Sequence, residues 1–416
     1  VKVDEFYVNP YLEEFRVPEF DRIENGFWFY NKGKPVYLTG FHYFYLNWWE
    51  LNTGYPDFRD TDRKLFYFWQ YCLEDPNCYG LLEITKRGVG KSYRMGAVAY
   101  LQTIRYSKAH VGIQSKTFED AEEFFLSKVA EPYKALPEFL NPVNSHGTEP
   151  QSGLNFFPPA RRGAASVFRK DKDEALRSML TFRNSGERAY DGATIKFLVQ
   201  DEIGKLEKKN GDAQKRLGVN RNCVYRDSKM VGKIWASTTV EDMDKGGEQV
   251  KKIWYDSDLE ERSDIGRTKS GLYRYFQSAL ECSYFDAWGY PVIVKAKEEH
   301  DAERKSREGD SVEFIGYVQR NPYNIEEAFM TLGGECIYNA AILQARQRFL
   351  QEFEMTIRGD LEWKDGIPDS KVVFVENKVN GAWEFSWTFN KPEDANRVAR
   401  GIEAVSYTHL RAHETS

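Results

Sequence analysis

Eight residues, Thr85-Lys-Arg-Gly-Val-Gly-Lys-Ser92, constrain the fold of this 416-residue chain more than any other feature. They follow a short apolar run, Leu81 to Thr85, and precede an amphipathic stretch that ends near Arg105. Apart from Thr85, which replaces a glycine, they match G-x-x-x-x-G-K-[ST]. That pattern joins a buried strand to a helix and wraps backbone N–H groups around a phosphate. The sequence therefore predicts a phosphate-binding loop at a strand–helix junction.

Each residue type in this loop has its own task. Gly88 and Gly90, with Val89 between them, let the backbone N–H groups turn inward on the β-phosphate. Lys91 then reaches the β- and γ-phosphates, and Ser92 binds Mg²⁺. Because short Gly-Lys-Ser strings also arise by chance, a plain glycine-rich turn is the alternative for this segment taken alone.

A second apolar run, Ile195 to Val199, leads through Gln200 into two adjacent carboxylates, Asp201 and Glu202. At the end of a strand beside a phosphate loop, the first acid binds Mg²⁺ and the second polarises the water that attacks the γ-phosphate. Two solvated acids at a strand end are the alternative for the pair alone. Combined with the loop, the pair indicates ATP hydrolysis that drives motion.

Further apolar runs at Val111–Gln114 and Lys233–Ala236 read as strands, with amphipathic stretches between the runs. Strands that alternate with helices imply a parallel sheet with covered faces and functional loops at the carboxyl ends of the strands. The predicted fold class is α/β. Within this class, the expected fold is a P-loop NTPase of the additional-strand, RecA-like type. Its mostly parallel sheet would be covered by helices, and an aromatic-rich N-terminal subdomain would precede it.

The ordered set of these motifs resembles the ATPase of phage terminase large subunits, whose phosphate loop typically carries basic residues ahead of the Gly-Lys-Ser/Thr. The resemblance covers roughly Tyr37 to Arg348. Four segments carry it: Lys86 to Ser92, His110 to Ser115, Val199 to Glu202 and Ala236 to Thr239. Asn321-Pro-Tyr-Asn-Ile-Glu-Glu-Ala-Phe329 is also similar to the signature at the end of that motor domain.

The resemblance implies ATP and Mg²⁺ as cofactors. It implies that Ser92 and Asp201 bind the metal, that Glu202 is catalytic, and that the nucleotide contacts come from Gly88, Val89, Gly90, Lys91, Ser92, Ser237, Thr238 and Thr239. The last three also couple hydrolysis to movement, although ordinary β-branched strand residues explain them equally well on spacing alone.

Two basic residues of the loop, Lys86 and Arg87, are further catalytic candidates. By the same resemblance, one of them acts on the γ-phosphate of its own or a neighbouring subunit as an arginine finger does, and which one acts stays open. Arg188, in the turn before the second apolar run, is another candidate for sensing or DNA contact. An ordinary surface arginine explains Arg188 equally well.

The resemblance further implies that the protein translocates viral double-stranded DNA into a procapsid. It would act in the cytoplasm of the infected host cell and would not be a component of the virion. The partners would be double-stranded DNA, the portal protein, the small terminase subunit and other copies of the chain in a ring on the procapsid. Since 58 Lys and Arg stand against 64 Asp and Glu, any DNA contact is local or built by several subunits. Candidate contacts, each also explained as ordinary surface charge, are Arg161, Arg162, Lys208, Lys209, Lys215 and Arg216.

Four segments are expected along the chain: an aromatic-rich N-terminal subdomain (1–60), the ATPase motor (61–348), a linker and β-element (349–404) and a non-native tail (405–416). The polar stretch Lys295–Asp310 reads as a solvated helix or loop. The β-element would lead to a nuclease of ribonuclease-H type that this chain lacks. Three aspartates after the motor do not suggest it, because they lie in a turn-rich stretch without strands that end in acids: Asp360, Asp365 and Asp369.

Other classes are disfavoured by the sequence. Five scattered cysteines give neither a disulfide framework nor a zinc site and fit a reducing cytosol, and the aromatic run Val36–Glu50 is too short and too interrupted for a membrane span. Three alternatives stay open: another additional-strand ATPase such as a helicase, a degenerate nucleotide binder suggested by Thr85, and a GTPase suggested by Asn390-Lys-Pro-Glu393. The pair Asp201-Glu202 argues against the GTPase.

Overall fold

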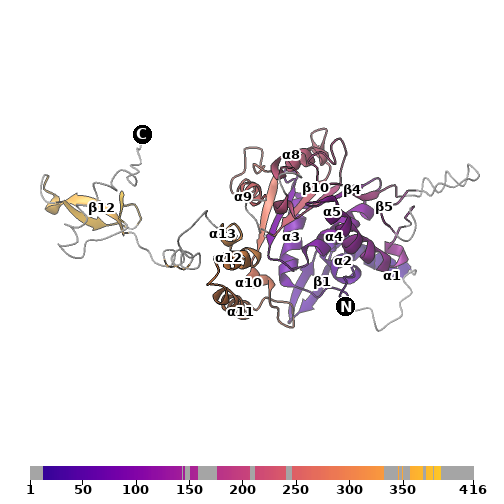
Figure 1. Cartoon of the computed structure of the whole chain (residues 1–416), viewed down its shortest axis with the longest axis horizontal. Coiled ribbons are helices and arrows are strands. Elements are labelled where there is room, and N and C mark those ends of the chain that lie inside the picture. Colours follow the sequence, from indigo (N-terminus) through magenta and orange to yellow (C-terminus); the bar gives the residue numbers. More distant parts are fainter. Residues whose placement is uncertain are drawn as a thin grey trace, which may run out of the picture. The chain divides into compact units, whose positions relative to one another are not determined.

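The computed structural model describes residues 13–142, 144–145, 150–157, 176–206, 211–239, 246–331, 345, 349, 357–368, 372–377 and 379–385 (Figure 1). The chain divides into two compact units, residues 1–335 and 336–416. Of the expected segments, the tail at 405–416 lies outside the described residues, and at the boundary 348/349 only residue 349 is described.

A seven-stranded sheet forms the centre of the first unit, in the order β11-β3-β10-β7-β4-β6-β5. Its strands are β3 (Gly80–Thr85), β4 (His110–Gln114), β5 (Leu154–Asn155), β6 (Met179–Phe182), β7 (Phe197–Asp201), β10 (Lys233–Thr238) and β11 (Leu272–Gln277). All neighbours are parallel except the edge strand β5, which is antiparallel to β6. This sheet confirms the predicted α/β class, and β10 is the additional strand between the phosphate-loop strand and the carboxylate strand.

Helices cover both faces of this sheet because alternate residues of each buried strand point to opposite sides. Leu81, Val199 and Trp235 pack with one layer, and Leu82, Leu198 and Ala236 with the other. The first layer contains α2 (Gly40–Trp48), α3 (Asp60–Glu74), α4 (Lys91–Arg105), α5 (Phe118–Phe125), η1 (Leu126–Ala130) and α6 (Glu131–Ala135). The second contains α8 (Ala213–Cys223), α9 (Gly247–Tyr255) and α13 (Ile325–Ala328).

The amphipathic stretch from Phe118 to about Leu136 is helical, but it contains a π-helical turn, η1, between α5 and α6. α4 approaches this turn closely at Gly96, where an added Cβ would lie 2.5 Å from the carbonyl oxygen of Lys128. A side chain at Gly96 would therefore push α4, the helix that begins at the phosphate loop, away from its neighbour.

The N-terminal aromatic segment packs into the same core. It forms α1 (Glu13–Asn25), the hairpin β1 (Phe27–Asn31) and β2 (Lys34–Leu38), and α2. Phe44 and Trp49 contact Tyr100 of α4, with ring centroids 6.2 Å and 5.3 Å apart. The segment thus supports the helix that follows the phosphate loop, and its predicted separation as a subdomain ending at residue 60 stays a prediction.

A helical layer follows β11: α10 (Ala279–Cys282), α11 (Ile293–Ser306), α12 (Ser311–Arg320) and then α13. The polar stretch from Lys295, expected to be a solvated helix or loop, forms most of the helix α11. It is not solvated throughout, because Ala296, His300 and Arg304 are buried. Short elements elsewhere are η2 (Glu138–Leu140), η3 (Ile203–Lys205) and the hairpin of β8 (Tyr225–Arg226) and β9 (Lys229–Met230). No described helix is both long and apolar enough to cross a membrane.

The described part of the second unit is an antiparallel sheet in the order β13-β12-β14, made of β12 (Ile357–Trp363), β13 (Val372–Glu376) and β14 (Trp383–Phe385). The expectation of a turn-rich stretch at Arg358–Asp369 was wrong for its first half, since β12 extends to Trp363 before η6 (Lys364–Gly366) begins. As expected, β12 does not end in an acidic residue. Asp360 helps β12 to pair with its neighbouring strands, because its carboxylate accepts hydrogen bonds from Asn377 Nδ2 at 2.9 Å and from Ala382 N at 2.8 Å. The role of this sheet as a linker stays a prediction.

Candidate phosphate-loop and carboxylate site

The phosphate loop turns between β3 and α4 on two glycines in the left-handed region. Gly88 has φ 84° and Gly90 has φ 86°, values that side-chain-bearing residues rarely adopt. Val89 between them is buried, which anchors the loop, and Ser92 is half-buried in the first turn of α4. The backbone N–H of Arg87 donates to the carbonyl of Arg320 at 3.1 Å, so the end of α12 holds the start of the loop.

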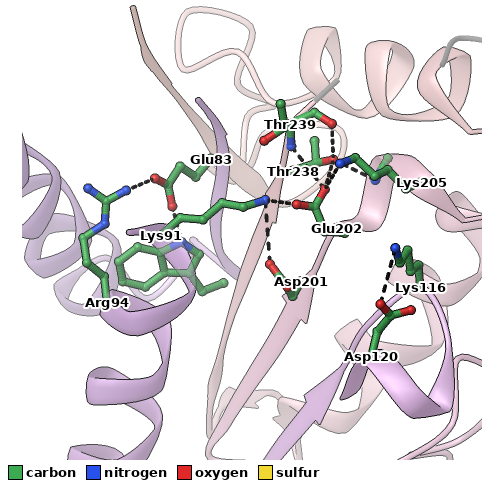
Figure 2. Close-up of polar contacts among 12 residues, drawn as sticks. Glu83, Lys91, Arg94, Lys116, Asp120, Asp201, Glu202, Lys205, Thr238 and Thr239 are labelled. Atoms are coloured by element: carbon green, nitrogen blue, oxygen red, sulfur yellow. Dashed lines mark hydrogen bonds and ion pairs between the residues drawn. The ribbon is translucent and has the colours of Figure 1, made fainter. Parts of the chain in front are cut away.

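Lys91, the first residue of α4, reaches across the end of β10 to the carboxylates that follow β7 (Figure 2). Its Nζ lies 2.5 Å from Oε1 of Glu202 and 3.8 Å from Oδ1 of Asp201. All three side chains are at least four-fifths buried. Two motifs that are far apart in the sequence thus meet at the carboxyl edge of the sheet.

Glu202 has an unusual backbone conformation, with φ 51° and ψ 42°. A left-handed conformation at a residue with a side chain costs about 1–3 kcal/mol and persists where surrounding contacts hold it. Here the second carboxylate oxygen is held by Lys205 Nζ at 3.2 Å and by Thr238 Oγ1 and Thr239 N at 3.4 Å (Figure 2). The carboxylate is therefore fixed between the ends of β7 and β10.

The pKa values of the two adjacent acids, Asp201 and Glu202, are shifted in opposite directions. Burial raises the pKa of Asp201 to about 6, and Lys91 offsets only part of that effect. Burial alone would also raise the pKa of Glu202, but the ammonium groups of Lys91 and Lys205 lower it to about 2. For Lys91, the charges of Glu202 and Asp201 outweigh burial and raise its pKa. Glu202 is therefore ionised at neutral pH, but it is the weaker base of the two acids while Lys91 and Lys205 contact it.

Several buried oxygens on the Lys91 side of the sheet have no hydrogen-bond partner among the described residues: Thr85 Oγ1, Asp201 Oδ1, Ser237 Oγ and Thr239 Oγ1. Ser237 lies opposite Asp201 in the β10–β7 register and opposite Glu83 in the β10–β3 register. Since buried polar groups are normally paired, this cluster fits a polar ligand.

The same oxygens fit a nucleotide with Mg²⁺, an ion that prefers oxygen ligands and is usually held by one or two carboxylates plus substrate phosphates. Within the described ranges, no three His, Cys, Asp or Glu side chains gather to hold a metal by themselves. Asp201 and Ser92, on the first turn of α4, remain the predicted donors for a metal that shares the nucleotide's phosphates.

Lys86 and Arg87, the two candidates for the arginine-finger role, differ in their exposure to solvent. Lys86 is half-buried, and burial lowers its pKa in surroundings that include Cys282 and Arg59. Arg87 is exposed, as is Arg188 in the turn before β7. The structure places neither Lys86 nor Arg87 against the Lys91–Glu202 pair, so the choice between them stays a prediction.

Sequence reasoning missed a buried ion-pair network next to the loop. Arg94, one helical turn after Lys91, donates to Asp62 of α3 and to Glu83 of β3, the latter at 2.7 Å. Glu83 also accepts from Trp235 Nε1 of β10 at 2.9 Å. The network ties α4 to α3, β3 and β10, and the only signal in the sequence was an unusual Glu83 within an apolar strand.

One candidate DNA contact is corrected by the structure. Arg216 is fully buried, because α8 packs over the end of β4 and brings its Nη1 within 2.9 Å of the carbonyl of Ser115. Burial lowers its pKa to about 10. Arg216 can therefore serve neither as a DNA grip nor as ordinary surface charge. Lys215 is exposed, and the remaining candidates lie outside the described residues: Arg161, Arg162, Lys208 and Lys209.

The Glu-Ala-Phe string forms a buried structural contact. Glu327 accepts from both Nη atoms of Arg304, at 3.0 Å and 2.6 Å, and from the backbone N–H of Tyr323 at 2.7 Å. Arg304 also lies over the ring of Tyr323, 3.5 Å from its centroid. These contacts join α11 to α13 and explain why a glutamate is buried there.

Comparisons with known proteins find no matching family model and no matching curated sequence. Among solved structures, the large terminase ATPase domain of Thermus phage P74-26 shares 13% identity at a TM-score of 0.36, over 64% of this chain and 99% of that one. The large terminase of bacteriophage HK97 shares 9% identity at a TM-score of 0.42, over 67% of this chain and 53% of that one. Because these likenesses are weak, we base the function on the residues of the site.

Proposed function

We propose that this chain binds ATP with Mg²⁺ and hydrolyses it, and that hydrolysis drives translocation of double-stranded DNA in the manner of a phage terminase large subunit. The observation that supports the ATPase part is the meeting of Lys91 with Asp201 and Glu202, 3.8 Å and 2.5 Å away, at the carboxyl edge of a parallel sheet. Ligands bind at that edge in open α/β sheets.

In the proposed reaction, Lys91 moves from Glu202 to the β- and γ-phosphates, which replace the carboxylate as its partner. The freed oxygen of Glu202 accepts a proton from the attacking water, whose oxygen bonds to the γ-phosphorus as the bond to the β–γ bridging oxygen breaks. Lys205 and Thr239 N keep the other oxygen of Glu202 in place during this step. Bound Mg²⁺, held by Asp201 and Ser92, would neutralise charge on the phosphates.

The order of the motifs along the chain, from the basic residues of the loop to Glu327-Ala-Phe329, supports a terminase motor over other additional-strand ATPases such as helicases. In this proposal, a ring of subunits contacts DNA phosphates without regard to sequence, and the procapsid's portal protein and the small terminase subunit complete the assembly. Thr85, at the first position of the loop, favours the second candidate, a nucleotide binder without turnover.

Steady-state ATP hydrolysis by the purified chain and by Glu202→Gln, with and without linear double-stranded DNA, tests the proposal. We expect Mg²⁺-dependent turnover that Glu202→Gln abolishes and that DNA stimulates. Nucleotide binding without turnover in the unmodified chain, even with DNA, would favour the degenerate binder. Turnover stimulated only by single-stranded DNA would favour a helicase.

A further inference from the structure

A cavity of about 710 Å³ opens at the amino-terminal ends of the sheet strands, away from the Lys91 site. Lys196 immediately precedes β7 and Lys233 begins β10, and both line it. Gln102 and Arg105, at the opposite end of α4 from Lys91, line it as well. The volume is within the range of small-molecule sites, roughly 300–1,000 Å³.

Positive charge exceeds negative charge around this cavity. Five cationic residues line it (Arg105, Lys196, Lys229, Lys233 and Arg267) against two carboxylates (Glu24 and Glu74). Glu24 is already paired with Arg105 at 2.7 Å, and Glu74 accepts from Gln70 at 2.7 Å. Glu74 keeps its negative charge because Gln70 is neutral, but the five cationic residues of the lining still outnumber its two carboxylates.

Lys196 and Lys233 are adjacent in the sheet, since Lys233 N donates to the carbonyl of Lys196 at 3.1 Å. Lys233 is buried, and its Nζ donates to the carbonyls of Asp75 and Cys78 at 2.7 Å and 2.6 Å. The Nζ of the half-buried Lys196 lies 4.0 Å from the ring centroid of Tyr106. Neither ammonium group forms an ion pair with a described carboxylate, although buried charges are normally paired.

Two further groups of the lining lack partners among the described residues. Gln102 is only 3% exposed, and its Oε1 accepts no hydrogen bond. The Nε of Arg267 is buried and donates none. Both residues belong to the lining of the cavity. Their unused acceptor and donor, together with the two lysines, favour a ligand that combines an anionic group with a hydroxyl or amino donor.

We propose that this cavity is a second binding site, for a small phosphate-bearing molecule with hydroxyl groups, of the size of a sugar phosphate or a free nucleotide. The phosphate would lie between Lys196 and Lys233, and a hydroxyl would donate to Gln102. Burial lowers the pKa of both lysines, and a bound phosphate would reverse that shift. The site does not depend on the proposed ATPase function, because it shares no residue with the phosphate loop.

Isothermal titration with inorganic pyrophosphate tests the site in a Lys91→Ala chain, where the phosphate loop is disabled. We expect saturable binding to one site, at least tenfold weaker after Lys196→Gln and retained after Lys196→Arg. Lys215→Gln, which removes an exposed lysine of α8, is the matched control and should bind like its parent. Absence of saturable binding, or equal binding by Lys196→Gln, would overturn the proposal.

Two additional measurements keep the result interpretable. Thermal melting of each variant checks its fold, and if Lys91→Ala is unfolded, the titrations are run with Lys91 intact, where Lys196→Gln should remove one binding event of two. A short duplex DNA is then added before pyrophosphate. We expect no competition, whereas displacement of pyrophosphate would place DNA backbone phosphates in the cavity and contradict a small-molecule ligand.

Discussion

Two of the buried cation–glutamate pairs among the described residues, Arg304–Glu327 and Lys91–Glu202, differ in their surroundings. In the Arg304–Glu327 pair, both oxygens of the glutamate accept short hydrogen bonds, at 2.6–3.0 Å. In the Lys91–Glu202 pair, one oxygen has a short contact of 2.5 Å, whereas the other has only contacts of 3.2–3.4 Å. Four neighbouring oxygens of that second pair have no hydrogen-bond partner among the described residues, although one of them, Asp201 Oδ1, lies 3.8 Å from Lys91 Nζ.

This difference separates a pair that stabilises the fold from a pair that is available for chemistry. In the Arg304–Glu327 pair both carboxylate oxygens are satisfied, although Arg304 Nε has no hydrogen-bond partner among the described residues. Breaking this pair leaves an uncompensated buried charge. The Lys91–Glu202 pair is surrounded by unused acceptors, and Glu202 is held at φ 51°. Little stabilisation is therefore lost when a ligand replaces Glu202 as the partner of Lys91. Substitutions at the two pairs should therefore affect different measurements.

The largest effect is expected for Glu202→Gln. It keeps the shape of the side chain but removes the proton acceptor, so ATP turnover should fall by about 10²–10⁴-fold. Steady-state hydrolysis measures this, and a thermal melt of the same sample should show little change. A loss of stability without a loss of turnover would reverse the assignment of the two pairs.

Arg304→Met should have the opposite profile. It leaves Glu327 buried without its partner, which costs about 3–5 kcal/mol in the free energy of unfolding. Urea denaturation measures this cost, with Lys305→Met, an exposed neighbour on α11, as the control. If the two variants unfold at the same urea concentration, the Arg304–Glu327 pair does not stabilise the fold as described.

Lys91→Ala should reduce nucleotide affinity by about 10–100-fold, because a charge-assisted hydrogen bond contributes about 1.5–3 kcal/mol. Titration with ATP and Mg²⁺ measures the affinity. Lys215→Ala provides a lysine-to-alanine control on an exposed helix position. Unchanged affinity after Lys91→Ala would exclude it as the phosphate-binding lysine and would leave its pair with Glu202 as a structural one.

The smallest effect is expected for Lys205→Gln. Lys205 contributes to the lowered pKa of Glu202, so its loss should raise that pKa. Turnover requires the ionised carboxylate, and therefore the acidic limb of the pH–rate profile should move to higher pH, by about one unit or less. Measurement of kcat against pH would detect this shift. A limb that stays in place would mean that Glu202 is not the group that titrates.

The sequence predicted those strands that a short continuous run of apolar residues marks, such as β3 and β7. Apolar runs next to Lys91 and Asp201 indicated β3 and β7, and the carboxyl-edge rule then placed the two motifs together. β11 was missed because Leu-Tyr-Arg-Tyr-Phe-Gln has neither strict alternation nor a continuous apolar run. β12 was missed because its glycine and charges resemble a turn, although neighbouring strands on both sides stabilise it.

Contacts between distant residues could not be predicted in the same way. Arg94 meets Asp62 and Glu83 only after α3, α4 and β3 have packed, and no spacing in the sequence encodes that distance. Arg216 looked like surface charge because it adjoins Lys215 in a polar stretch of the sequence, whereas its own side of α8 faces the sheet. The roles of the site residues themselves remain predictions that the experiments above address.

The hydrogen bond from Arg87 N to the carbonyl of Arg320 divides the phosphate loop into an anchored half and a free half. The amides that follow Arg87 lie next to Gly88 and Gly90, whose positive φ angles turn the chain toward α4. If these amides close on a phosphate, as the proposed function requires, the hydrogen bond at Arg87 would transmit the movement to the end of α12. A substitution that loosens the α11–α13 layer would then also shift the phosphate loop.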